Sequence, residues 1–182
     1  MDQIRNEKIF NIPNFLTMLR IALLPAVVWH FLKGDSRGAL MVYLAAMLTD
    51  AVDGFAARKL NQITSFGKLL DPIADKLSLL TLLGLFVADG QIPVWVMGVV
   101  LGKEAALVAG SAIAFRRGII VYALPIGKVT TVAFVLSMVA RFLGMREMAD
   151  VLLGVSIALS LVALLWYTLV GMKKMNEQQA AA

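Results

Sequence analysis

Long apolar stretches are the feature of this 182-residue sequence that most restricts its fold. About six of them occur, and charged residues, glycines or prolines separate one from the next. A helix that crosses the hydrocarbon core of a membrane needs roughly 20 mostly apolar residues, and each stretch has about that length. The sequence therefore predicts an all-α, polytopic integral membrane protein with about six transmembrane helices. The predicted spans are 15–33, 38–57, 69–88, 92–115, 126–143 and 149–171.

The composition agrees with a membrane location. Hydrophobic residues make up 60% of the chain and charged residues 16%, whereas an ordinary soluble domain is about 45–50% apolar and about 25% charged. Such a chain is too apolar to be disordered. Because it has no cysteine, it can form neither a disulfide framework nor a thiolate metal site. We expect one membrane domain over residues 1–182, with a cytoplasmic N-terminal segment at 1–14 and a short cytoplasmic tail at 172–182.

The basic residues indicate the orientation in the membrane. With the N-terminus inside, eleven lysines and arginines fall on inner segments and four on outer segments, which favours a cytoplasmic location for both termini. The net charge of +5 is therefore interpreted as topology and not as nucleic-acid binding. The inner bases are Arg5, Lys8, Arg20, Arg58, Lys59, Lys68, Arg116, Arg117, Lys128, Lys173 and Lys174. The outer bases are Lys33, Arg37, Arg141 and Arg146.

Four aspartates lie at or near the ends of predicted spans, where charge is costly. A charge at the bilayer centre costs about 2.5–3.5 kcal/mol, and carboxylates at one level also repel one another. Asp50 and Asp53 are three residues apart and Asp71 and Asp75 four apart, so each pair shares a helical face. The short basic loop 58–68 joins the two helices as an antiparallel pair, which predicts that the acids face each other at the cytoplasmic end. Four oxygen ligands suit Mg²⁺ or Mn²⁺.

Structural interpretations of the same residues stay open. The acids could instead form ion pairs at solvated helix ends with Arg58, Lys59, Lys68 and Lys76. Small residues near the acids allow a ligand to approach closely, but they equally allow helices to pack closely. These small residues are Gly54, Ala57 and Gly67.

The acids belong to a longer pattern. Residues 50–58 read Asp-Ala-Val-Asp-Gly-Phe-Ala-Ala-Arg, and residues 67–75 read Gly-Lys-Leu-Leu-Asp-Pro-Ile-Ala-Asp. Every fixed position matches the signature D-x-x-D-G-x-x-A-R, a short spacer, then G-x-x-x-D-x-x-x-D, so the chain resembles the CDP-alcohol phosphatidyltransferase family. Residues 11–20 also resemble the start of the bacterial phosphatidylglycerophosphate synthase and cardiolipin synthase branch.

The resemblance implies an enzyme of phospholipid biosynthesis. This family transfers a phosphatidyl group from CDP-diacylglycerol to an alcohol and releases CMP, with divalent metal ions, here two, on the phosphate oxygens. Its metal ligands correspond to Asp50, Asp53, Asp71 and Asp75. Asp75 is also implied as the general base for the acceptor hydroxyl. The positions that accommodate the CDP-lipid are Gly54, Ala57, Arg58 and Gly67. The resemblance further implies a homodimer among the lipids of the bacterial inner membrane, with its active site at the cytoplasmic face.

The acceptor alcohol is less constrained. Gly102-Lys103-Glu104 resembles a fourth-span motif that usually reads Ala-Arg-Glu in phosphatidylglycerophosphate synthases, and residues 127–131 resemble their Gly-Lys-x-Lys-Thr. Thr130 replaces the second lysine of that motif, and Ala112 stands where an arginine is usual. We expect glycerol-3-phosphate as acceptor, with phosphatidylglycerol in a cardiolipin synthase as the alternative. The residues expected to contact the acceptor are Lys103, Arg116, Arg117 and Lys128, of which both arginines equally suit positive-inside anchoring.

A different class of protein also fits a small polytopic chain with acids in its spans. Such a chain could be a cation transporter or a membrane scaffold. Transporters often have Gly- or Pro-interrupted helices in corresponding halves, whereas the four acids here belong to one pair of adjacent spans. That placement favours an enzyme acting at the membrane interface.

Overall fold

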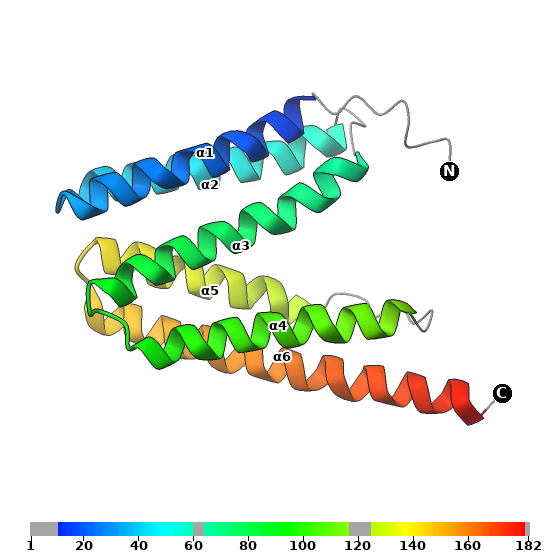
Figure 1. Cartoon of the computed structure of the whole chain (residues 1–182). Coiled ribbons are helices and arrows are strands. Elements are labelled where there is room, and N and C mark those ends of the chain that lie inside the picture. The colour runs from blue at the N-terminus through cyan, green and yellow to red at the C-terminus, as the bar shows by residue number, and fades with distance from the viewer. Residues whose placement is uncertain (1–10, 60–63, 117–124, 181–182) are drawn as a thin grey trace. The chain divides into compact units, whose positions relative to one another are not determined.

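The computed structural model describes residues 11–59, 64–116 and 125–180, and within these ranges it contains six α-helices and no strand (Figure 1). The helices are α1 (Ile12–Leu32), α2 (Ser36–Lys59), α3 (Ser65–Ala88), α4 (Val94–Arg116), α5 (Pro125–Phe142) and α6 (Arg146–Ala180). The all-α prediction is thereby confirmed for the described residues. The chain divides into two compact units, Met1–Ile92 and Pro93–Ala182, and each is described by itself.

Helix α1 begins earlier than the predicted span at residue 15. Asn11 is its N-cap, and the Asn11 side chain accepts a hydrogen bond from the backbone N–H of Asn14 at 2.9 Å. Pro13 lies in the first turn, where a residue without a backbone N–H leaves no helical hydrogen bond unmade. Residues 12–14, expected to form part of the polar N-terminal segment, are therefore the first turn of α1.

The same turn ends α1, α3 and α5. Gly34, Gly90 and Gly144 follow these helices with φ of 75°, 73° and 78°, the left-handed region that glycine adopts without strain. After α1, the backbone N–H groups of Gly34 and the next residue donate to the carbonyls of Phe31 and His30 at 2.9 and 3.0 Å. This pair of bonds is a Schellman motif, which satisfies carbonyls that the helix end leaves open.

Helix α1 is central to the first unit. It packs against α2 and against α3, whereas α2 and α3 make few or no direct contacts among the described residues. Between α1 and α3, Phe31 meets Phe86 edge to face with ring centroids 5.2 Å apart, and Val27 is fully buried. Among the described residues α1 thus provides a packing surface for both α2 and α3, and the antiparallel pairing of α2 and α3 with facing acids stays a prediction.

In the second unit, α5 and α6 form a tightly packed hairpin, and α4 contacts α6. The Ser137 hydroxyl donates to the carbonyl of Ala149 at 2.7 Å. Arg141 pairs with Asp150 at 2.5 Å, and only 1% of its side chain is exposed. Arg141 was counted among the outer bases, and the structure shows that it also ties the two helices together.

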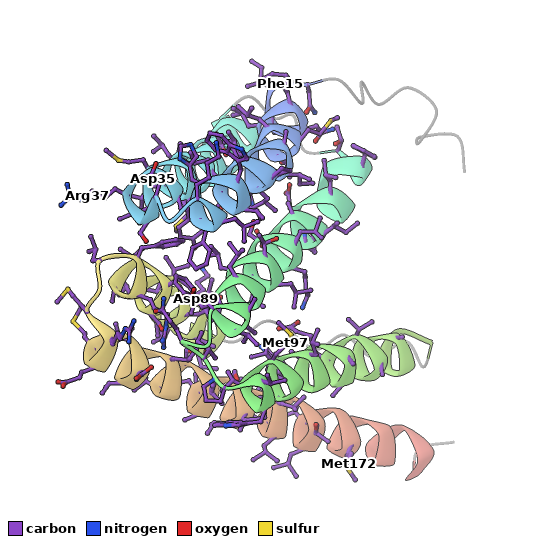
Figure 2. The ribbon with its side chains drawn as sticks, turned by 60° about the vertical axis from the view of Figure 1, so that its left-hand side comes forward. Phe15, Asp35, Arg37, Asp89, Met97 and Met172 are labelled. Carbon is purple, nitrogen blue, oxygen red and sulfur yellow. The ribbon has the colours of Figure 1, made fainter. Side chains whose placement is uncertain are left out.

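In the part of the chain that the structure describes, two helices are long and apolar enough to cross a membrane by length and composition alone, namely Ile12–Leu32 and residues Arg146–Met172 of α6. Only 22% of each apolar window is buried within the protein, unlike the core helix of a soluble domain. Helix α6 continues to Ala180, although the sequence predicted a tail from 172. Asp35 and Arg37 lie at the turn between α1 and α2, and Phe15 lies near the other end of α1 (Figure 2).

Candidate active site

The starts of α1 and α3 are tied together by buried polar side chains. Thr64 is the N-cap of α3, and its hydroxyl oxygen accepts a hydrogen bond from the Gly67 backbone N–H at 3.0 Å. The same oxygen accepts a hydrogen bond from the side-chain amide of Asn14 at 3.1 Å. Asn14 is 2% exposed and Thr64 8%. This contact fixes the first turn of α3 against the first turn of α1.

Gly67 is required by this close approach. A Cβ atom added to Gly67 would lie 2.6 Å from Asn14 Oδ1, closer than packing allows, and 3.2 Å from Thr64 Oγ1, closer than most Cβ contacts. The sequence left open whether this glycine serves a ligand or helix packing. The structure shows a packing role, and a role toward the CDP-lipid remains a prediction.

The aspartates of α3 lie one and two turns beyond this contact. The Thr17 hydroxyl of α1 lies 2.9 Å from Asp71 Oδ1 and 3.1 Å from the carbonyl oxygen of Pro13, so its single proton can be donated to either. One turn further along α1, Arg20 donates to Asp75 Oδ1 at 2.7 Å. Helix α1 thus contacts both signature aspartates of α3.

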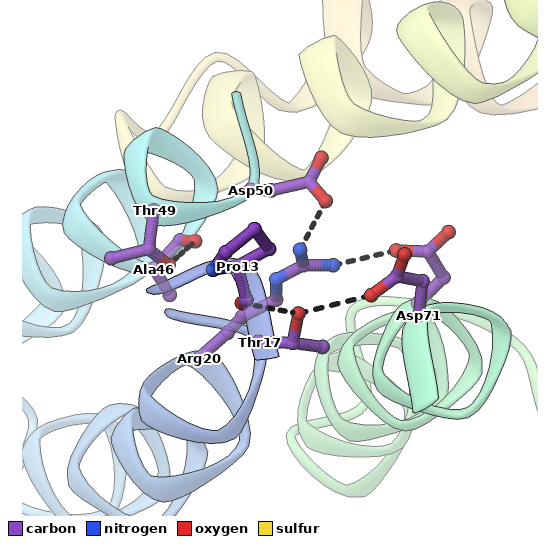
Figure 3. Close-up of polar contacts among 8 residues, drawn as sticks. Pro13, Thr17, Arg20, Ala46, Thr49, Asp50 and Asp71 are labelled. Atoms are coloured by element: carbon purple, nitrogen blue, oxygen red, sulfur yellow. Dashed lines mark hydrogen bonds and ion pairs between the residues drawn. The ribbon is translucent and has the colours of Figure 1, made fainter. Parts of the chain in front are cut away.

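Arg20 connects the acids of two helices. Its guanidinium forms ion pairs with Asp50 of α2 and with Asp75 of α3, and Figure 3 shows it between Asp50 and the carboxylates of α3. The Arg20 side chain is only 4% exposed, whereas those of Asp50 and Asp75 are 54% and 66% exposed. The carboxylates therefore present one side to a buried cation and another to the outside.

Sequence reasoning missed the contribution of α1. Arg20 was counted as an inner base that reports topology, and Thr17 and Asn14 were given no role. A signal was available, because Asn14, Thr17 and Arg20 are spaced three apart and so share one face of an apolar helix. A polar face on a membrane helix indicates a functional or pairing role.

Several predicted site residues lie outside the described side chains. Helix α2 runs through the second half of the first signature segment, but its side chains are not described there. The predicted residues concerned are Asp53, Gly54, Ala57, Arg58, Arg116 and Arg117.

The two described lysines of the predicted acceptor set belong to the second unit. Lys103 of α4 pairs with Glu104 Oε1 at 2.6 Å, and these side chains are 12% and 16% exposed. Lys128 is exposed in the first turn of α5. Thr130, which stands where a lysine is usual, donates its hydroxyl to the carbonyl of Ile126 at 2.9 Å within its own helix.

The donor chemistry of the first unit fits a hard divalent cation. Its described acids offer only carboxylate oxygens, the ligands that Mg²⁺ and Mn²⁺ prefer, and the exposed oxygens of Asp50 and Asp75 can be reached from outside. In the described part of the chain, no three acidic or histidine side chains gather closely enough to hold a metal ion. Asp50 and Asp75 meet at Arg20 instead, and the Asp53 side chain is outside the described set.

The helices are apolar, and one end of the first helical unit carries carboxylates that pair with a buried arginine. Together these features define a membrane-associated protein with a charged site. The chain belongs to the CDP-alcohol phosphatidyltransferase family, whose sequence model matches residues 10–173. The family consists of membrane-bound enzymes of lipid biosynthesis that transfer a phosphatidyl group from a CDP-lipid, and it is generally dependent on divalent metal ions. The resemblance inferred from residues 50–75 is confirmed.

Individual relatives are named for two different activities. A CDP-diacylglycerol–glycerol-3-phosphate 3-phosphatidyltransferase of Bacillus subtilis is 36% identical over 150 residues, which are 74% of this chain and 77% of that protein. The Aquifex aeolicus protein of the same name is 34% identical over 174 residues, 90% of this chain and 97% of its own length. A CMP-forming cardiolipin synthase of Streptomyces coelicolor is 37% identical over 123 residues, 64% of this chain and 57% of that protein.

Proposed function

We propose that this phosphatidyltransferase uses glycerol-3-phosphate as its acceptor and forms phosphatidylglycerophosphate and CMP from CDP-diacylglycerol. The observation that carries the proposal is the similarity to two relatives named for this reaction, one of which aligns over 90% of the chain. The acid-bearing site of the first unit supports it, because a diphosphate-containing lipid requires cations, and carboxylates of α2 and α3 are suited to bind them.

The proposed chemistry assigns a role to each signature acid. Asp50, Asp53, Asp71 and Asp75 would hold two ions of Mg²⁺ or Mn²⁺, which neutralise charge on the phosphate oxygens when bound. Asp75 accepts the proton of the acceptor hydroxyl through its exposed carboxylate oxygen. The acceptor oxygen bonds to the phosphorus that carries diacylglycerol, and the bond from that phosphorus to the bridging oxygen breaks. CMP leaves with the electron pair.

The residues around the acids would position the two substrates. We assign Gly54, Ala57, Arg58 and Gly67 to the CDP-lipid, with the Arg58 guanidinium as a charged fork for phosphate. The basic residues assigned to the acceptor are Lys103, Arg116, Arg117 and Lys128. The exposed side chain of Lys128 supports this role more strongly than the Glu104-paired side chain of Lys103 does.

We further propose that the chain is one membrane domain with six spans and both termini in the cytoplasm of a bacterial cell. The excess of eleven inner bases over four outer bases supports this orientation. Exposed apolar side chains such as Leu32, Val94 and Val151, which are 74%, 72% and 67% exposed, are suited to contact lipid. A homodimer in the inner membrane belongs to the same proposal, and the resemblance to the family supports it.

Phosphatidylglycerol is the second candidate acceptor, and a specific observation favours it. Thr130 and Ala112 stand where basic residues are usual in glycerol-3-phosphate enzymes, and the Lys103 charge is matched by Glu104. Fewer unmatched positive charges would weaken binding of a phosphate monoester. The chain would then act as a cardiolipin synthase, as the Streptomyces coelicolor relative is named.

An acceptor panel tests the proposal. The purified protein in detergent is given labelled CDP-diacylglycerol, Mg²⁺ and one alcohol at a time: glycerol-3-phosphate, phosphatidylglycerol, inositol phosphate or serine. We expect CMP release and a labelled phosphatidylglycerophosphate only with the first. Product with phosphatidylglycerol alone would identify a cardiolipin synthase, and no CMP release with any alcohol would favour a transporter or scaffold.

The role of Asp75 is tested by Asp75→Asn. We expect the rate of transfer to fall by about 10²–10⁴-fold, because the variant has no carboxylate to accept the hydroxyl proton, while the protein still binds CDP-diacylglycerol and metal. Asp150→Asn is a matched control, because Asp150 is 65% exposed and pairs with a buried arginine as Asp75 does. Undiminished turnover by Asp75→Asn would exclude the role assigned to this residue.

A further inference from the structure

Arg20 occupies carboxylates that the proposed metal ions would also need. Its guanidinium pairs with Asp50 and with Asp75 Oδ1, and the family signature makes both aspartates metal ligands. A divalent ion bound to the exposed oxygens of these two carboxylates would lie beside the guanidinium, and two cations beside each other repel strongly. Binding of a divalent ion to these oxygens must therefore weaken or break the contacts of Arg20.

A displaced Arg20 would need another anion. Only 4% of its side chain is exposed, and a guanidinium cannot lose its proton in a protein, so a buried arginine without an anionic partner is strongly unfavourable. The diphosphate of CDP-diacylglycerol would bring phosphate oxygens to this location together with the metal. The planar, forked guanidinium suits phosphate oxygens as well as carboxylate oxygens.

The rest of the polar face of α1 can stay in place during such an exchange. Asn14 contacts Thr64 at the start of α3, and Thr17 lies 2.9 Å from Asp71. Neither contact depends on Arg20, so α1 can remain packed against α3 while the long arginine side chain alone changes partner. The exchange therefore requires a side-chain movement and no movement of a helix.

We propose that Arg20 is a substrate-binding residue that pairs with Asp50 and Asp75 before metal binds and with a phosphate of CDP-diacylglycerol afterwards. The proposal rests on the proposed function, since the anion is the diphosphate of that substrate. It has two consequences of opposite sign. Arg20 weakens metal binding to the substrate-free protein because it competes for the carboxylates, and it strengthens binding of the CDP-lipid once metal is present.

The test measures two affinities of the full chain in detergent, without an acceptor alcohol. Electron paramagnetic resonance of free Mn²⁺ gives the metal affinity of the substrate-free protein. Titration with a short-chain CDP-diacylglycerol at saturating Mn²⁺ gives the lipid affinity. For Arg20→Gln we expect the affinity for Mn²⁺ to rise about 10-fold and the affinity for the CDP-lipid to fall by about 10-fold or more. Both changes lie within the usual range of coupling between sites.

Arg141→Gln is the matched control. Arg141 is as buried as Arg20 and pairs with an aspartate, but it belongs to the second unit, and we expect neither affinity to change by more than about twofold in this variant. Arg20→Lys keeps the charge and serves if Arg20→Gln does not fold. Because an ammonium lacks the fork that bridges two carboxylates, we expect its changes to have the same signs and smaller sizes.

Three results would overturn the inference. If both affinities fall, Arg20 only holds the site together, and if Mn²⁺ alone binds more tightly, Arg20 competes with metal but does not contact the lipid. Unchanged affinities would mean that Arg20 has neither role. A wild-type protein that fails to bind the CDP-lipid with Mn²⁺ present would instead contradict the proposed function itself, so the two failures are distinguishable.

Discussion

Gly67 shows how a signature residue can serve packing beside a proposed ligand site. Its Cα lies so close to the buried amide of Asn14 that an added Cβ would be 2.6 Å from Asn14 Oδ1. That amide cannot simply turn away, because it also donates a hydrogen bond to Thr64. We expect Gly67→Ala to lower the stability of the protein by about 1–3 kcal/mol, the usual cost of overpacking a filled site. Thermal unfolding in detergent measures this loss.

Gly154→Ala is the control for that experiment. Gly154 lies within α6, and an added Cβ would meet nothing within 4 Å. Replacing it should leave stability unchanged or raise it by up to about 1 kcal/mol, because alanine loses less backbone entropy in a helix. Equal unfolding temperatures for the two variants would show that the first turns of α1 and α3 are not tightly packed at Gly67.

The acids could be predicted from sequence and their central partner could not. Asp50, Asp71 and Asp75 stand out because carboxylates are rare in apolar stretches and their spacing matches helical faces. Arg20 fits the positive-inside count equally well as an ordinary inner base. Only the packing of α1 against both α2 and α3 distinguishes the two interpretations, and that arrangement depends on contacts distant in the sequence.

At the scale of elements, all six helices could be predicted, and their ends less well. Each predicted span corresponds to one helix of the structure. The reason is that a stretch of about 20 apolar residues is the main requirement for a membrane-spanning helix. The end of α6 differs most, at Ala180 against a predicted 171. Residues 172–180 are mostly polar, so they do not extend an apolar span, but they contain no glycine or proline and consist mainly of good helix formers.

The connection between α1 and α2 gives a pH-dependent prediction. Asp35 Oδ1 accepts a hydrogen bond from the Gly38 backbone N–H at 2.8 Å, which caps the start of α2. This bond, together with the hydrogen bond to His30, lowers the pKa of the Asp35 carboxyl below its ordinary value of 3.8. A lowered pKa in the folded protein means that the unfolded chain binds the proton more readily, so this contribution to stability is complete above about pH 4 and is lost as the pH falls further.

Asp35→Asn isolates this contribution, because asparagine can still cap the helix but does not titrate. We expect the wild-type unfolding temperature to exceed that of the variant at neutral pH and the difference to shrink below pH 3.8. Asp89→Asn, the same substitution at the turn after α3, serves as the control variant. A difference between wild type and Asp35→Asn that stays constant from pH 7 to pH 3 would contradict the capping role of the charge.

At the scale of the whole molecule, the number of spans decides on which side of the membrane the acids lie. Within the described ranges two helices satisfy a simple test of length and apolar composition, whereas the sequence predicts six spans. If only α1 and α6 crossed, the whole segment between them would lie outside, together with Asp50 and Asp75. With six spans, the connection between α2 and α3 lies in the cytoplasm, and so do the adjacent acids.

Cysteine labelling distinguishes these arrangements, because the chain has no cysteine of its own. Single cysteines at Arg37, Asp89 and Met145 should react with a membrane-impermeant maleimide in intact cells, since these residues lie exposed at or beside the turns after α1, α3 and α5. Asn61→Cys and Gln178→Cys should react only after the membrane is permeabilised. The decisive position is Asn61, because two spans and six spans place it on opposite sides while agreeing on Arg37, Met145 and Gln178. Labelling of Asn61→Cys in intact cells would therefore exclude six spans and a cytoplasmic active site, and protection there would support both.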